Sequence, residues 1–158
     1  MDYVKAEAQW EAEWQKTLAA GKKEGKVVVY GSSFVPAVKK QAPIFKKQFG
    51  IDLDVMALRG DNFVAKLRTE EAAGLNLTDM IITGGNTMFA VKQMGMTEPM
   101  DNKLILPEVT NPKLWYTLDS LPWMDDAKHL FPFYAYPNRD IAINTDLIKP
   151  GEIQSWQD

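Results

Sequence analysis

Residues 24–41, EGKVVVYGSSFVPAVKKQ, form the most informative segment for predicting the fold. Val27 to Tyr30 form an unbroken run of strand-favouring apolar residues, which is typical of a strand buried on both faces. Residues 31–33, Gly-Ser-Ser, then interrupt the run, and Pro36 fits the first turn of a following helix. We therefore predict a strand, a turn rich in hydroxyl groups, and a helix.

The same order of elements recurs twice further along the chain. Residues 51–58 alternate apolar and acidic side chains at first and then become apolar on both faces, which predicts a strand that becomes buried as it proceeds. Asp61 is a suitable N-cap for a helix that Gly74 closes. Met80 to Thr83 predict a third strand, and residues 84–86 predict a turn into another helix.

The first residues predict a helix that packs as a flank on this core. Ala6, Trp10, Trp14 and Leu18 recur every fourth residue, which is the spacing of one helix face. The two tryptophans are therefore interpreted as packing residues.

Strands that alternate with single helices imply right-handed crossovers and a mostly parallel sheet, so we predict an α/β fold. After Gly95 the chain is rich in proline and aspartate and favours short helices only. Two strand-like runs follow, at Leu130 to Tyr136 and at Asp140 to Asn144. We divide the 158 residues into an N-terminal helix (1–25), an α/β lobe (26–136) and a final segment (137–158).

The composition excludes several classes of site. The chain has no cysteine, which excludes disulfides, thiolate metal sites and a cysteine nucleophile, and a single histidine excludes multi-histidine metal sites. A formal net charge of −3 disfavours a nucleic-acid surface. No run approaches the roughly 18 apolar residues of a membrane helix. The first 15 residues lack the basic start and apolar stretch of a leader peptide, so we expect either a cytosolic protein or a leader that has been removed.

Polar or small residues follow each predicted strand. Ligands of open parallel sheets bind beyond the carboxyl ends of the strands, and each of these turns leads into a helix whose first N–H groups are unpaired. Hydroxyl groups, an amide and a guanidinium at this edge predict a site for a small anionic or oxygen-rich ligand. The candidate ligand-binding residues are Ser32, Ser33, Arg59, Thr83, Gly84, Gly85 and Asn86.

Other interpretations of these residues stay open at this point. Glycine and serine after a strand are also simply good turn and cap residues. Asp125, Asp126 and His129 could suggest a metal, but adjacent aspartates beside one histidine are more typical of a solvated helix end, so we predict no metal site. The chain has no phosphate loop, no dinucleotide-binding motif and no Ser-His-Asp set, so we predict no catalytic residue and no cofactor.

Four stretches together resemble a known family. They are LAAGKKEGKVVVYGSS, FKKQFGIDLDVMALRGDNFVAKLRTEEAAG, TDMIITGG and DIAINTDLIKPGEIQSWQD, and they extend from about Trp14 to Trp156. They resemble the extracellular (periplasmic) solute-binding proteins of ABC importers, family 1, in the branch of the ferric-iron-binding proteins. The resemblance implies a type II periplasmic-binding-protein-like lobe, with the second lobe absent and residues 137–158 as the crossover towards it.

The resemblance also implies a function without catalysis. Such a protein captures a small-molecule or ion solute between two lobes and delivers it to an ABC permease, from a periplasmic or extracellular location reached by secretion or a lipid anchor. The family's contacts would fall on the seven residues above, with Tyr136 and Asn144 at the hinge side of the cleft. The first turn has serines in place of an iron-binding histidine or tyrosine, which favours an anion over ferric iron.

Two consequences and two rival functions follow. A single lobe supplies only part of the contacts, so we expect weak solute binding. A bare sheet edge favours a homodimer, formed along that edge or by exchange of residues 130–144. The rivals are a small α/β enzyme acting on a phosphorylated or carboxylated substrate, and the ligand-sensing domain of a transcription factor.

Overall fold

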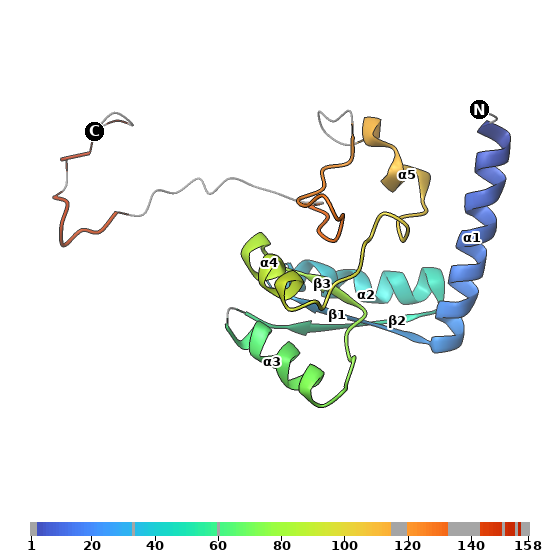
Figure 1. The fold of residues 1–158 in the computed structure, drawn as a ribbon, viewed down its shortest axis with the longest axis horizontal. Helices are drawn as coiled ribbons and strands as arrows, with labels where there is room; N and C mark the ends of the chain where they lie inside the picture. The colour runs from blue at the N-terminus through green and yellow to red at the C-terminus, as the bar shows by residue number, and fades with distance from the viewer. Residues whose placement is uncertain are drawn as a thin grey trace.

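The computed structural model describes residues 3–32, 34–59, 61–114, 120–132, 143–149, 151–153 and 155. Within them the chain forms helices, strands and one short 3-10 helix in an alternating order that confirms the prediction up to the fourth helix (Figure 1). The elements are α1 (Tyr3–Glu24), β1 (Lys26–Gly31), α2 (Val35–Phe49), β2 (Asp52–Ala57), α3 (Asp61–Ala72), β3 (Met80–Ile82), α4 (Gly85–Gln93), α5 (Pro107–Thr110) and η1 (Pro112–Leu114).

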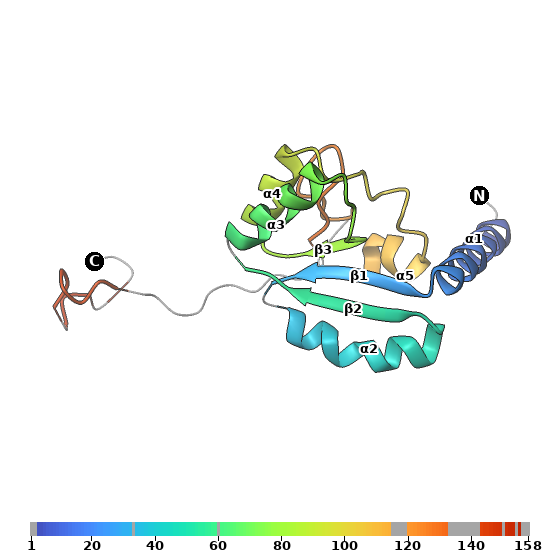
Figure 2. The ribbon, with the colours of Figure 1, turned by 90° about the horizontal axis from the view of Figure 1, so that it is seen from below.

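The three strands form one sheet in the order β2-β1-β3, and both pairings are parallel. The register sets Tyr30 of β1 beside Met56 of β2 and Ile81 of β3. Figure 2 shows α2 on one side of this sheet and α3 and α4 on the other. The predicted α/β fold with a parallel sheet flanked by helices is therefore confirmed.

Each face of the sheet has its own apolar core. Towards α3 and α4, the buried side chains of Tyr30, Phe63, Leu67 and Val91 pack together. Towards α2, Val29, Val35 and Val55 do the same. Because β1 is the central strand, its alternate residues enter both cores, which is why its sequence has no polar face.

The expectation that the second strand becomes buried as it proceeds is wrong. Val55 is buried, but Met56 is 41% exposed and Ala57 is also exposed. The reason is that β2 is an edge strand. Met56 projects to the same face as Tyr30, and on that face α3 and α4 cover β1 and β3 and leave the β2 edge open.

Helix α1 stands at the amino ends of β1 and β2, as Figures 1 and 2 both show. Its C-terminal half packs on the sheet domain, with the Trp14 ring in a T-shaped contact with Phe49 at 5.8 Å between ring centroids. Gly25 ends the helix with a φ of 80°, and its N–H donates to the Gly21 carbonyl. No helix within the described ranges is long and apolar enough to cross a bilayer.

The two strand-like runs after residue 129 receive little support. Residues 130–132 and 143–144, which are the described parts of these runs, form no strand. The remainder, including Tyr136, lies outside the described residues. Residues 143–149 lie apart from the sheet in both Figure 1 and Figure 2.

Gly31 is required at the end of β1 because its surroundings leave no room for a side chain. A Cβ at this position would lie 2.8 Å from Val35 Cγ2 and 3.3 Å from the Ile82 carbonyl oxygen. Val35 is buried and β-branched, so its side chain cannot easily rotate away. We expect Gly31→Ala to lower the free energy of unfolding by about 1–3 kcal/mol in urea denaturation.

Gly84→Ala is the matched control for that substitution. A Cβ at Gly84 would meet nothing within 4 Å, and its backbone φ of −70° suits any residue. We expect a change of no more than about 0.5 kcal/mol. Equal effects of the two substitutions would contradict this explanation of Gly31.

Candidate functional site

The carboxyl ends of β1 and β3 bring two predicted site residues into direct contact. Thr83 Oγ1 donates a hydrogen bond of 3.0 Å to Ser32 Oγ, and the Ser32 N–H donates to the Ile82 carbonyl. Both hydroxyl groups are partly buried. Because the Ser32 oxygen accepts from Thr83, its own O–H remains a donor for a further group.

The end of β2 completes the same edge. The Leu58 N–H donates to the Gly31 carbonyl at 2.8 Å, so the chain is still paired with β1 one residue before Arg59. Neighbouring strands lie roughly 4.8 Å apart, so the three strand ends span on the order of 10 Å. Arg59 is exposed, and no hydrogen bond or ion pair joins its side chain to the described residues. The edge thus carries Arg59, Ser32 and Thr83 in that order.

The helix starts at this edge are not equivalent. At α2 the Val35 N–H donates to the Ser32 carbonyl, the Ala37 N–H donates to the Phe34 carbonyl, and Pro36 has no N–H. The expectation that this helix offers unpaired N–H groups is therefore wrong, because the tight turn uses them. At α4 the first internal helical bond runs from the Met88 N–H to the Gly84 carbonyl, so the preceding N–H groups are the donors closest to the edge.

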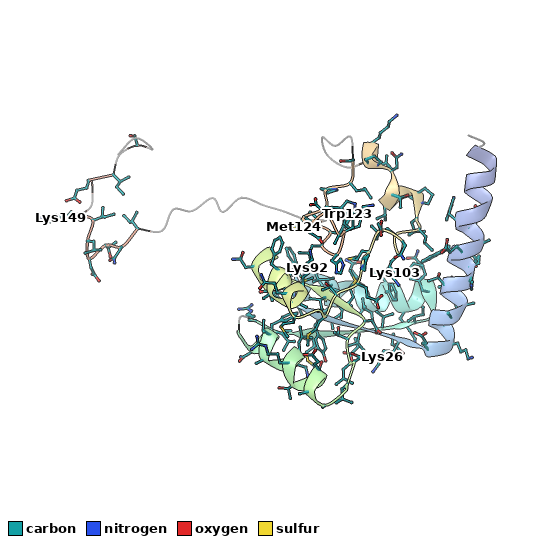
Figure 3. All side chains as sticks on the ribbon, viewed as in Figure 1. Lys26, Lys92, Lys103, Trp123, Met124 and Lys149 are labelled. Carbon is teal, nitrogen blue, oxygen red and sulfur yellow. The ribbon has the colours of Figure 1, made fainter. Side chains whose placement is uncertain are left out.

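The absence of a side chain has a different effect at Gly84 and at Gly85. Gly84 precedes α4 in extended conformation with open space around it, so a ligand could reach its backbone. A Cβ at Gly85 would lie 3.1 Å from Met124 Cε, so the small residue there lets residues 120–132 pack close to α4. Figure 3 shows Met124 and Trp123 above α4 on the side of Lys92.

The remaining candidate residues divide into two groups. Asn86 is exposed in the first turn of α4, beside the edge. Asn144 begins a turn of its own, in which its side chain accepts from the Asp146 N–H, and this turn lies apart from the sheet (Figure 1). Ser33 and Tyr136 lie outside the described residues.

Asp125 has a role that the sequence analysis missed. Its carboxylate is 6% exposed and accepts from Lys92 Nζ at 2.7 Å and from the Leu130 N–H at 2.8 Å. Burial alone would raise the pKa of Asp125, but the Lys92 ammonium and the N–H groups of Leu130 and His129 lower it by more. These bonds of Asp125 therefore hold residues 120–132 against α4. The residues around Asp125 in the sequence gave no indication of this role, because Lys92 is 33 residues away along the chain.

The neighbouring His129 is also engaged, with its Nδ1 2.7 Å from Thr97 Oγ1. Among the described residues no group of three or more histidine, cysteine, aspartate or glutamate side chains is arranged to hold a metal ion.

The cluster of Tyr30, Lys66 and Glu70 beneath α3 was also not predicted from the sequence. Glu70 is 6% exposed, and its Oε1 accepts from the Tyr30 hydroxyl at 2.7 Å and pairs with Lys66. Burial and the bond to Glu70 raise the pKa of Tyr30, so its hydroxyl stays a donor. The sequence does contain a pattern that indicates burial of Glu70. This residue follows Phe63 by seven positions and Leu67 by three, which places it on the apolar face of the helix.

Comparison with known proteins leaves the family open: no protein-family model matches the chain, and no curated protein matches it significantly.

Proposed function

We propose that this chain is a type II periplasmic-binding-protein-like lobe of a solute-binding protein, which serves an ABC importer by holding a small anionic or oxygen-rich solute at the carboxyl edge of its sheet. The observation that carries the proposal is the hydrogen bond between Thr83 and Ser32 across the ends of β3 and β1. It fixes two hydroxyl groups at the one place where a parallel sheet presents strand ends to a ligand.

The arrangement of charge and donors supports an anion. Arg59 lies at one end of the edge with no partner among the described residues, and the start of α4 lies at the other. A guanidinium and the N–H groups of a helix start both favour a carboxylate, phosphate or sulfate oxygen. Binding on one edge leaves the other side of the solute in water. Closure of a second lobe over the solute would then supply the remaining contacts.

The geometry at this edge is also relevant to the alternative function, a small α/β enzyme. A serine hydroxyl becomes a nucleophile when a base takes its proton. The partner of Ser32 Oγ within the described residues is a threonine, which cannot act as that base. The pair is therefore better suited to binding than to acyl or phosphoryl transfer.

An anion titration followed by ¹H–¹⁵N correlation spectra tests the proposal. We expect sulfate, phosphate or a small dicarboxylate to shift the amide signals of Ser32, Gly84, Gly85 and Asn86 with millimolar affinity. The double variant Ser32→Ala/Thr83→Val is expected to bind about tenfold more weakly, because a charge-assisted hydrogen bond is lost.

Ser120→Ala is the matched control, because Ser120 is exposed and belongs to a different segment. It should leave the titration unchanged. Shifts confined to other surfaces, or equal affinity of the double variant and the control, would count against a solute site at this edge. Ferric citrate in a parallel titration separates an iron ligand from a plain anion.

A further inference from the structure

A methionine from residues 120–132 lies against the helix start that the proposed solute site uses (Figure 3). The Met124 methyl group rests on Gly85, where a Cβ would lie 3.1 Å from Met124 Cε. Because the Cα–Cβ bonds of a helix tilt towards its N-terminus, this methyl group lies on the side of Gly85 that faces the start of α4. The first N–H groups of α4 point the same way. An apolar group therefore stands beside the donors that would hold an anion.

Met124 is held in place without being buried. Its N–H donates to the Leu130 carbonyl at 3.0 Å, and the next residue, Asp125, is bonded to Lys92 of α4. The Met124 side chain is nevertheless 42% exposed. The anchored segment thus keeps an apolar side chain in contact with both α4 and solvent.

Helix α4 itself adds a second exposed apolar group at the same place. Phe89 follows Gly85 by four positions, so it lies one turn further on the same helix face, and it is 39% exposed. Helical side chains lean back towards the N-terminus, so a ring at this position covers the turn that contains Gly85. Neither Phe89 nor Met124 belongs to the buried cores of the sheet. Two different segments therefore place exposed apolar surface next to the start of α4.

We propose that the solute is an anion with an apolar body beside its charged group, such as an aryl phosphate or an aromatic carboxylate. The charged group accepts hydrogen bonds from the Ser32 hydroxyl and from the first N–H groups of α4, and the body lies on Met124 and Phe89. This inference rests on the proposed solute site and specifies its ligand. Met124 is then a specificity-determining residue, which favours the apolar body and contributes nothing to binding of the anion.

The first experiment compares phenyl phosphate with glycerol phosphate, which has the same charged group on a polar body. We expect phenyl phosphate to bind about fivefold more tightly, the effect of removing roughly 40 Å² of apolar surface from water. In spectra of methyl-labelled methionine, phenyl phosphate should also shift the Met124 signal. Equal affinity for the two esters would overturn the proposal, and so would an unchanged Met124 signal.

A parallel titration with inorganic phosphate distinguishes failure of this inference from failure of the proposed function. If phosphate shifts the Ser32 and Gly84 amide signals but phenyl phosphate binds no more tightly, the inference alone is wrong. If none of the three anions shifts these signals, the proposed solute site is wrong, and the inference fails with it.

The variant Met124→Gln then tests the residue itself, because glutamine has a similar shape and a polar end. We expect phenyl phosphate to bind about fivefold more weakly to it, while inorganic phosphate binds as before. Met80→Gln is the matched control, since Met80 is also 42% exposed but begins β3 at the opposite end of the strand. It should leave both affinities unchanged. Equal phenyl phosphate affinity for the two variants would overturn the proposal, as would an equal loss of inorganic phosphate binding in Met124→Gln.

Discussion

Replacing Phe63 with alanine is expected to lower the free energy of unfolding by about 3–5 kcal/mol. The Phe63 side chain is 0% exposed and lies between Tyr30, Leu67 and Val91 in the core that joins α3 to the sheet. Loss of the ring removes buried apolar area and leaves a cavity that fixed strands cannot fill. Urea denaturation followed by tryptophan fluorescence measures the effect.

The control for Phe63 is Phe89→Ala. Phe89 is on α4, close to the same face of the sheet, but is 39% exposed. We expect a loss of no more than about 1 kcal/mol. If the two substitutions cost the same, the core does not lie where the structure places it. A loss of 3–5 kcal/mol is a large share of the stability of a domain of this size, so we expect Phe63→Ala to lower the yield of folded protein as well.

The second large effect is expected for Asp125→Ala. The substitution removes the acceptor for Lys92 and for two backbone N–H groups, those of His129 and Leu130. Buried donors left without an acceptor cost more than the lost bond itself, so we expect destabilisation by about 2–4 kcal/mol. Residues 120–132 should detach from α4 first, which faster amide exchange at Leu130 would reveal.

Asp126→Ala is the matched control, because Asp126 is the adjacent residue and is exposed. It should change the free energy of unfolding by no more than about 0.5 kcal/mol. Comparable losses from the two substitutions would show that charge in this segment matters, and not the specific bonds of Asp125.

The contribution of Asp125 should also depend on pH. Its folded-state pKa is lowered, so the stability that it contributes is fully present above its unfolded pKa of about 3.9 and is lost as pH falls through the lower, folded value. The difference in stability between the wild type and Asp125→Asn should therefore shrink as pH falls below about 4. A difference that stays constant from pH 7 to pH 3 would contradict the lowered pKa.

Much of the fold could be predicted from local patterns. The apolar run from Val27 to Tyr30 indicated a central strand, and the helix spacing around Trp14 indicated α1. Gly25 and Gly50 both mark helix ends with a positive φ, as glycine permits. These features depend on residues a few positions apart, so the sequence alone contains them.

The exposure of Met56 could not be predicted in this way. Its neighbours in the sequence indicate burial, but exposure depends on which strand lies at the edge, and strand order is set by long-range pairing. The same applies to Asp125, whose partner Lys92 is 33 residues away. Nothing near Asp125 in the sequence distinguishes it from Asp126.

The candidate site also combines features that local sequence patterns predict with features that depend on the tertiary structure. Local patterns were enough to predict that polar or small residues follow each strand, because the residue types at a strand end are a local property. Long-range packing, in contrast, places Ser32 against Thr83, engages the N–H groups at the start of α2 in its own turn, and leaves Asn144 apart from both. The physical reason is that a hydrogen bond between side chains 51 residues apart depends on the order and register of the strands that carry them, and packing of the whole sheet fixes both.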